Sequence, residues 1–265
     1  MSILSLVKPH RSLTLFAFSL SLISLHGQEP SSPALSAQEL ANQMNATFQG
    51  NALIRSQMEI HLPNGGKRVM QLQIKQRRTK TASDLSYRVL WPNEYRDQVV
   101  ILHQDAGKAP TGSVTVPHQP MRNLAGSQMG DGLLESDLSY QDAIENVYNW
   151  KHQAIVGTEV INGVTCQILE SKPDNSSVSI YAKARSWIDP RRLVPLRIEK
   201  YSTTDKLERR IDITRVARDE KHHPIPAGLT VRNPGKNSTT DFNGASINQD
   251  VSFTDSDFAS ANIVP

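Results

Sequence analysis

The sequence predicts a mainly β protein with some α structure, built as a wide antiparallel sheet with one helix before it and a short helix in its middle. Apolar residues recur at helical spacing only in one segment near the N-terminus and in a short segment near residue 140. Much of the remaining chain alternates between apolar and polar residues, which is typical of strands with one buried face.

Residues 1–27 are expected to be a cleaved signal peptide. Lys8 and Arg11 precede an uncharged, largely apolar stretch from Ser12 to Leu25, which is the order of an n-region and an h-region. The stretch is shorter than the ~20 residues that cross a bilayer. An uncleaved membrane anchor is the alternative, because the residues before Gly27 form a poor small-x-small cleavage pattern. We expect an exported protein of the periplasm.

The single cysteine and the charge balance exclude two further classes of protein, lipid-anchored and nucleic-acid-binding. Cys166 lies far from the predicted cleavage site and alternates with Val164 and Ile168, so we expect a buried thiol and no lipid anchor. The chain has 29 basic and 26 acidic side chains, and two of the basic ones lie in the predicted signal peptide. This near balance gives no reason to expect a nucleic-acid partner.

A Pro- and Ser-rich linker, residues 28–35, precedes the first predicted helix. Ser36 and Glu39 form the pattern of a capping box. Three apolar residues then recur at helical spacing, namely Leu40, Met44 and Phe48. We predict an amphipathic helix over residues 37–49 that packs this apolar side against the sheet.

From residue 53 onward the period of the pattern changes to alternation. Met70, Leu72 and Ile74 alternate with polar residues, and the turn at residues 63–66 is expected to join two strands as a hairpin. Further strands are predicted at residues 85–91, 98–103, 113–116, 149–156, 164–171, 178–188, 194–202, 206–218, 229–233 and 238–243. An antiparallel meander is the simplest topology, and residues 36–265 are expected to form one domain.

The alternation lapses between residues 126 and 148. Ser136 or Asp137 can cap a short helix there, which would carry Tyr140 and neighbouring apolar residues. Residues 121–134, which precede it, are rich in Gly and Met and lack periodicity. This composition favours a mobile connection that crosses the sheet.

The sequence contains no recognised catalytic or metal-binding motif. HExxH, CxxC, GxSxG and phosphate-binding glycine patterns are all missing. His222 and His223 are adjacent, so on a strand they would point to opposite faces and would not share a metal. Acids such as Asp137 and Asp142 could serve in hydrolysis, but acids at this spacing are common on solvated surfaces. We therefore expect no catalytic residue, metal or cofactor.

Several segments of the chain match one known family in their order and spacing. They are DLSYQD at 137–142, GTEVING at 157–163, CQILE at 166–170, YAKARSWID at 181–189, PLRIEKY at 195–201 and SFT at 252–254. Together they resemble the outer-membrane lipoprotein-sorting family of LolA-like carriers, over roughly residues 50–260. The strand predicted at 113–116 departs from the family pattern, because only Arg122 follows it where the family has several arginines.

The resemblance implies an open, curved antiparallel β half-barrel of about eleven strands, covered on its concave side by the N-terminal helix and the short middle helix. In this family such a half-barrel shelters an acyl chain. Methionine and aromatic side chains suit a pocket for flexible chains. The candidate ligand-binding residues are Phe48, Met58, Met70, Leu72, Tyr87, Trp91, Met121, Met129, Tyr140 and Trp187. Each of them could equally be an ordinary core residue.

Two functions of different classes stay open. The first is a monomeric periplasmic carrier that shelters a lipoprotein acyl chain or another lipid and passes it towards the outer membrane. Its partners would be the lipid cargo, an inner-membrane exporter and an outer-membrane acceptor. The second is a ligand-free scaffold or adaptor of an envelope export machine, and a hydrolase of envelope material is a less favoured third.

Overall fold

The computed structural model describes residues 35–174, 179–219 and 222–259. All of them belong to one compact unit that begins at Leu35. The predicted signal peptide and the linker up to residue 34 lie outside the described residues. Within the described part of the chain, no helix is long and apolar enough to cross a membrane.

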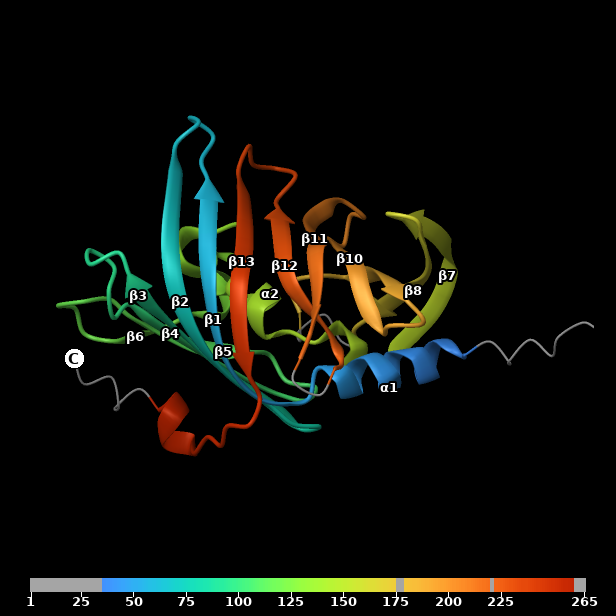
Figure 1. Ribbon diagram of the computed structural model, residues 1–265, viewed down its shortest axis with the longest axis horizontal. Helices are drawn as coiled ribbons and strands as arrows, with labels where there is room; N and C mark the ends of the chain where they lie inside the picture. Colours follow the sequence, from blue (N-terminus) through green and yellow to red (C-terminus); the bar gives the residue numbers. More distant parts are fainter. Residues whose placement is uncertain (1–34, 175–178, 220–221, 260–265) are drawn as a thin grey trace, which may run out of the picture. The chain divides into compact units, whose positions relative to one another are not determined.

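One open antiparallel sheet contains the thirteen strands of the described residues (Figure 1). Its order is β6-β5-β4-β3-β2-β1-β13-β12-β11-β10-β9-β8-β7, so that the first and the last strand pair in its middle. The strands are β1 (Gly50–His61), β2 (Lys67–Arg78), β3 (Ala82–Trp91), β4 (Val99–Asp105), β5 (Thr111–Thr115), β6 (Arg122–Asn123), β7 (His152–Ile161), β8 (Val164–Lys172), β9 (Lys183–Asp189), β10 (Val194–Tyr201), β11 (Leu207–Arg218), β12 (Pro224–Arg232) and β13 (Thr239–Asn248).

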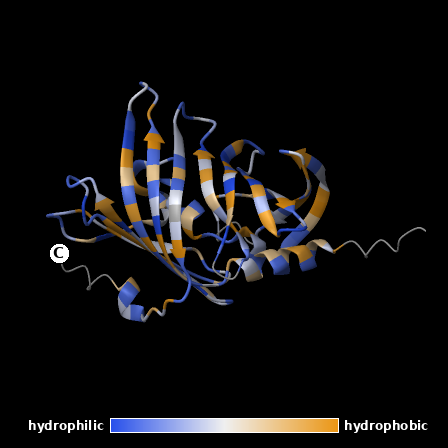
Figure 2. Ribbon diagram, viewed as in Figure 1, coloured by the Kyte–Doolittle hydropathy of each residue, from blue (hydrophilic) through white to orange (hydrophobic). Residues whose placement is uncertain are grey.

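The pairing of the strands places the apolar side chains on one face of the curved sheet. Met58 of β1 lies opposite Met70 of β2 on one side and Phe242 of β13 on the other. Tyr87 of β3 lies opposite Ile74 of β2. Because side chains alternate along a strand, these residues share a face, and Figure 2 shows the corresponding alternation of hydrophobic and hydrophilic bands.

Residues 124–144, which we call the covering segment, lie over this face, which we call the inner face. The segment contains two short 3-10 helices, η1 (Gly126–Gly130) and η2 (Leu133–Glu135), followed by the helix α2 (Tyr140–Ile144). Its buried side chains pack in the main core with residues of β1–β5 and β11–β13. The packed residues of the segment are Leu124, Met129, Leu133, Leu134, Leu138, Tyr140, Ala143 and Ile144.

The helix α1 (Ala37–Thr47) covers the other end of the inner face. Leu40 and Met44 are fully buried against β8, β9 and the 3-10 helix η3 (Val147–Asn149), as the sequence predicted. Ser36 caps the helix through the expected capping box with Glu39. Phe48 stands just beyond the helix and contacts Tyr148, with 5.5 Å between ring centroids.

The outer face of the sheet carries two smaller apolar clusters. Cys166, which is fully buried as predicted, packs with Trp187 and three neighbours on β7–β10. Phe258 of the 3-10 helix η4 (Asp255–Phe258) packs on Val99 and Ile101 of β4. The outer face is therefore not uniformly polar.

The fold class predicted from the sequence is confirmed, with two differences in detail. The sheet has thirteen strands where about eleven were expected, and β6 was missed because its two residues are too few to show alternation. The cap of α2 is Ser139, which forms a capping box with Asp142, whereas Ser136 or Asp137 was expected. The hairpin of β1 and β2 is confirmed.

Candidate functional site

An apolar pocket opens on the inner face between the central strands and the covering segment. Three adjacent strands contribute Ile54, Ile74 and Tyr87, which lie opposite one another in the register. Leu229 and Phe242 face each other across β12 and β13 and complete the wall. The remaining lining residues are Ser56, Leu138, Pro226, Ala227, Gly228 and Ile247.

This pocket has a volume of about 170 Å³. An engineered cavity of roughly 150 Å³ in another protein stays dry and binds benzene, so a pocket of this size suits a short apolar group. The end of an acyl chain is such a group, and each buried CH₂ contributes about 0.8 kcal/mol.

A cluster of buried charges attaches α2 to the sheet next to the core. Asp142 of α2 lies 3.0 Å from Nζ of Lys200 on β10 and 2.8 Å from Nε of Arg209 on β11. Its Oδ1 also accepts a hydrogen bond from the hydroxyl of Tyr181 at 2.9 Å. Glu145 lies 3.2 Å from Nζ of Lys200. The cluster thus balances two acidic and two basic groups.

The electrostatics keep Asp142 ionised. Burial opposes the charge of Asp142, but Lys200, Arg209 and the hydrogen bonds from Ser139 outweigh it and lower its pKa to about 2. Burial likewise opposes the charge of Lys200, yet Asp142 and Glu145 raise its pKa above the usual value. A carboxylate with so low a pKa is a poor general base near neutral pH. The charge cluster is therefore suited to attach α2 to the sheet and not to transfer protons.

Arg78 of β2 holds the other end of α2. Its guanidinium donates hydrogen bonds to the carbonyl oxygens of Ala143 and Ile144 at 3.1 and 3.0 Å, and to Oγ of Ser83 at 3.3 Å. Burial lowers the pKa of Arg78. Cations are favourable at the carbonyl end of a helix, so Arg78 satisfies carbonyls that the short helix cannot pair.

Asp137 fixes the loop just before α2. Its carboxylate accepts hydrogen bonds from Oγ of Ser238 at 2.6 Å and from Oγ1 of Thr240 at 2.9 Å. The expectation that Asp137 and Asp142 lie on a solvated surface was wrong, because Asp137 is 3% exposed and the side chain of Asp142 is fully buried. Their partners come from strands about 60 to 100 positions later in the chain, which a local pattern does not reveal.

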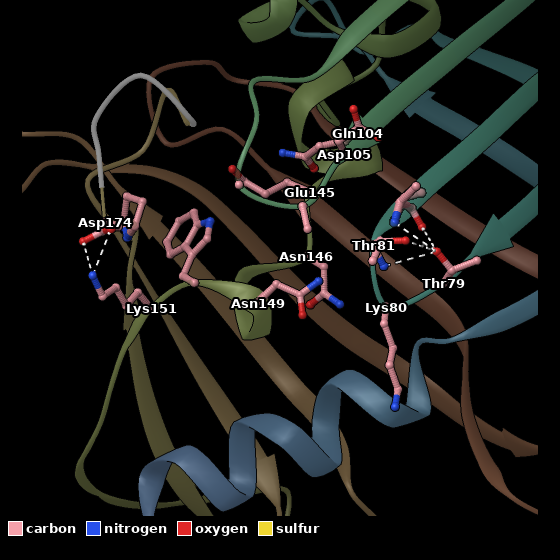
Figure 3. A pocket seen from close by; sticks show the side chains of 16 residues that line it. Thr79, Lys80, Thr81, Gln104, Asp105, Glu145, Asn146, Asn149, Lys151 and Asp174 are labelled. Carbon is pink, nitrogen blue, oxygen red and sulfur yellow. Dashed lines mark hydrogen bonds and ion pairs between the residues drawn. The ribbon is translucent and has the colours of Figure 1, made fainter.

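A second cavity, which we call the polar cleft, has a volume of about 440 Å³ (Figure 3). The turns after β2 and β4, the stretch from Glu145 to Lys151 and the end of β8 form its walls. In Figure 3 Asn146 and Asn149 lie between Lys80 on one side and the ion pair of Lys151 and Asp174 on the other. Its lining is mostly hydroxyl, amide and charged side chains.

The structure places the ten candidate residues of the sequence in different surroundings. Met58, Met70, Leu72, Met129 and Tyr140 are buried in the main core, and Tyr87 borders both this core and the apolar pocket. Phe48 is half-buried beside α1. Trp91 and Met121 are exposed, at 48% and 40%. Trp187 lies on the outer face and donates a hydrogen bond to Glu159. The structure therefore brings together only part of the set, and a ligand-binding role for these residues stays a prediction.

Sequence reasoning missed most of the residues that line the apolar pocket. Ile54, Leu229, Phe242 and Ile247 are aliphatic or aromatic residues in alternating strands, like many core residues. The candidate ligand-binding residues were selected by type, as methionines and aromatics, and not by their position along the strands. The available signal was the alternation itself, which put Ile54 and Ile74 on an apolar face.

Comparisons with known proteins agree with the architecture. A family model described as "Uncharacterized protein" matches residues 118–264. No curated protein matches the chain.

Three solved structures match over nearly the whole of their own chains. A DUF1329 family protein from Desulfovibrio piger has a TM-score of 0.77 at 18% identity, covering 86% of this chain and 98% of that chain. A protein from Vibrio parahaemolyticus, described as an outer membrane lipoprotein-sorting protein domain, has a TM-score of 0.77 at 14% identity, with coverage of 86% and 97%. A LolA superfamily protein from Nitrosomonas europaea has a TM-score of 0.68 at 15% identity, with coverage of 86% and 99%. At these identities the likeness shows a common fold.

Proposed function

We propose that this chain, which belongs to the family of uncharacterized proteins whose model matches residues 118–264 and has the fold of the LolA superfamily, is a periplasmic carrier of lipid. The cargo is a lipoprotein acyl chain or another lipid, which the protein shelters on the inner face and passes towards the outer membrane. The single observation that carries the proposal is the apolar pocket on the inner face, which Leu138 of the covering segment borders. A folded protein that leaves an apolar cavity beside its core loses contacts there, and an apolar ligand restores them.

The way in which the covering segment is attached supports exchange of cargo. Its polar anchors are Asp137, Asp142 and Arg78, and each of them bonds to groups that water can also solvate. Lifting the segment therefore exposes charges whose hydration offsets part of the lost pairing. A covering segment held by apolar packing alone would gain no such hydration of charges when it lifts.

The electrostatics support a carrier over an enzyme. Asp142 is held ionised by two cations, and among the described residues no group of three His, Cys, Asp or Glu side chains could hold a metal ion. A hydrolase needs a nucleophile or a pair of carboxylates within reach of one another and able to exchange protons.

The N-terminal segment supports a location in the periplasm. Residues 1–27 have the charge and apolar order of a signal peptide, and Cys166 is buried far from it. The likeness to a structure described as an outer membrane lipoprotein-sorting domain supports an envelope protein. We therefore place the mature chain, from about residue 28, in the periplasm.

Mass spectrometry of copurified lipid tests the proposal. The full chain is produced with its own leader in a Gram-negative host, purified from the periplasm without detergent and extracted with organic solvent. An unrelated periplasmic protein carried through the same steps is the control. We expect lipid at a stoichiometry near one in the extract of this chain alone. A chain without lipid that also fails to bind palmitate after purification would contradict the carrier.

The alternative is a ligand-free scaffold. The modest volume of the apolar pocket supports this alternative, because the inner face has no large permanent cavity there. In that case the covering segment is a fixed part of the core. Hydrogen exchange in the covering segment would then be as slow as in the central strands, with and without palmitate.

A further inference from the structure

The two edges of the sheet end in very different strands. β6 at one edge has two residues, whereas β7 at the other edge has ten (Figure 1). The main chain of β7 pairs with β8 on one side. Among the described residues, no hydrogen bond joins the other side of its main chain to the rest of the protein. β7 therefore offers a row of N–H and C=O groups with which a further strand can pair.

The exposed side chains of β7 are largely apolar. Ile155, Val156 and Val160 are 37%, 47% and 63% exposed, and they are half of the six large apolar side chains that lie exposed in the described part of the chain. Soluble proteins protect a sheet edge by shortening it, by placing lysine or proline on it, or by a bulge. β7 contains neither lysine nor proline, and it has one bulge, between Ile155 and Gly157. So apolar an edge with so little protection is suited to pairing.

The bulge determines which side chains of β7 share a face. Gln153 points to the inner face, because its amide donates a hydrogen bond at 2.7 Å to the carbonyl oxygen of Trp150, which packs beneath α1. Glu159 points to the outer face, where it accepts a hydrogen bond from the indole of Trp187. Residues an even number of positions apart share a face in a regular strand, so the extra residue of the bulge reverses the order. His152, next to Gln153, therefore lies on the same face as Glu159.

The sequence of β7 is complementary to itself in one antiparallel register. When two copies pair about a two-fold axis between Ile155 and Val156, these two apolar residues lie opposite each other. His152 of each copy then lies opposite Glu159 of the other copy, and both are on the outer face, as antiparallel pairing requires. Apolar pairs and pairs of a base with an acid both stabilise neighbouring strands. A two-fold axis makes each of these contacts twice.

His152 and Glu159 are both available for this pairing. More than half of the His152 side chain is exposed, and its Nε2 lies 3.5 Å from the exposed carboxylate of Asp174. Glu159 is nearly half exposed and lies 3.4 Å from Arg197 in addition to its bond with Trp187. The two oxygens of a carboxylate have about four acceptor positions, so a histidine of a second copy can be added to these contacts.

We propose that this chain forms a two-fold dimer in which β7 pairs with β7 of a second copy, with His152 opposite Glu159. The sheet then continues through both copies. Because opposite residues of paired strands share a face, the two inner faces and their apolar pockets lie on the same side of the joined sheet. The inference does not depend on the carrier function, and it differs from the monomer expected from the sequence.

Analytical ultracentrifugation of the purified protein, over a dilution series in the micromolar range, tests the proposal. The variants are Val156→Lys, His152→Glu and Glu159→Lys. Met121→Lys is the matched control, because it places the same charge on an exposed apolar residue beside β6, at the opposite edge of the sheet. Circular dichroism confirms that each variant is folded, and hydrogen exchange locates the interface.

We expect the wild type and Met121→Lys to form dimers as the concentration rises, with slower hydrogen exchange in β7 of the dimer. Val156→Lys places a charge in the apolar centre of the interface and should weaken dimerisation at least about tenfold. His152→Glu and Glu159→Lys each remove the pairing of base with acid and should weaken it by roughly 3- to 10-fold. An equimolar mixture of these two variants should form a heterodimer, because each pair again joins a base and an acid.

Three results would overturn the proposal. A wild type that stays monomeric at every concentration leaves β7 open to a strand of another protein. A dimer that Val156→Lys does not weaken, or that slows exchange outside β7 alone, has its interface on another surface. A mixture of His152→Glu and Glu159→Lys that dimerises no better than either variant by itself rejects the register.

Discussion

Oδ1 of Asp142 on α2 and Nζ of Lys200 on β10 lie 3.0 Å apart, and both side chains are almost completely buried. Arg209 on the next strand contacts the other carboxylate oxygen of Asp142 at 2.8 Å. Ion pairs of this kind add little net stability, because both partners lose their hydration, but they fix geometry. This pair therefore determines where α2 lies on the inner face.

Removing the cation of this pair should be strongly destabilising. In Lys200→Met, Asp142 keeps Arg209, but Glu145 loses its one basic partner among the described residues. We therefore expect the free energy of unfolding to fall by roughly 3–5 kcal/mol. Urea denaturation followed by circular dichroism measures it. The control Lys206→Met removes the exposed pair with Glu208 and should change stability by less than about 0.5 kcal/mol. Equal losses in the two variants would contradict a special role of the buried cluster.

The low pKa of Asp142 predicts a specific acid sensitivity. The folded value of about 2 lies below the ordinary value of 3.8, so the stabilisation is present above pH 4 and is lost as the pH falls towards 2. The depression corresponds to about 2 kcal/mol. Urea titrations of the wild type and Asp142→Asn at pH 7, 4 and 2.5 measure it. The stability difference between the two proteins should shrink at the lowest pH, and a constant difference would refute the prediction.

Arg78→Lys should loosen the covering segment without unfolding the sheet. A lysine keeps the charge but cannot donate to the carbonyl oxygens of both Ala143 and Ile144. We expect a global loss of about 1 kcal/mol and faster hydrogen exchange in α2. The neighbouring Arg77→Lys is the control, because Arg77 pairs with Asp84 and Asp255 away from α2. Unchanged exchange in α2 for Arg78→Lys would show that other contacts hold the segment.

A charge placed in the wall of the apolar pocket should block lipid. Ile247 is half-buried and lines the pocket, so Ile247→Asp introduces a carboxylate beside the acyl chain at a position that tolerates solvent. We expect the affinity for palmitate, measured by calorimetry, to fall by at least about tenfold, since each 1.4 kcal/mol of desolvation is a factor of ten. Ile155→Asp on the exposed edge strand β7 is the control and should bind as the wild type does. Normal binding in both would place the lipid elsewhere.

Elements governed by local patterns could be predicted from the sequence. The capping box of Ser36 and Glu39 and the spacing of Leu40 and Met44 define α1 within two residues. Long strands such as β2 and β11, of twelve residues each, have room for a recognisable alternation, as at Met70, Leu72 and Ile74 of β2. Short elements could not be predicted, because two residues of β6 or one 3-10 turn in η2 contain too few positions for a period.

The candidate site depended on contacts that are distant in the chain. Ile74 and Leu72 both alternate correctly on β2, but Ile74 lines the pocket while Leu72 is fully buried in the core. The difference is set by the position of the covering segment, which Asp142 and Arg209 fix across 67 positions of the chain. A single sequence shows both acids and bases but not which of them pair.

The pairing of β1 with β13 has a consequence for the order of folding. The two halves of the sheet, β1–β6 and β7–β13, meet only where the first strand binds the last, so the sheet closes only when the final strand is present. Closing such a long loop is slow compared with forming the hairpins on either side. A polypeptide that crosses a membrane through a narrow channel must stay unfolded until it has passed. For the exported protein that we propose, a late closing step would keep the chain unfolded during that interval.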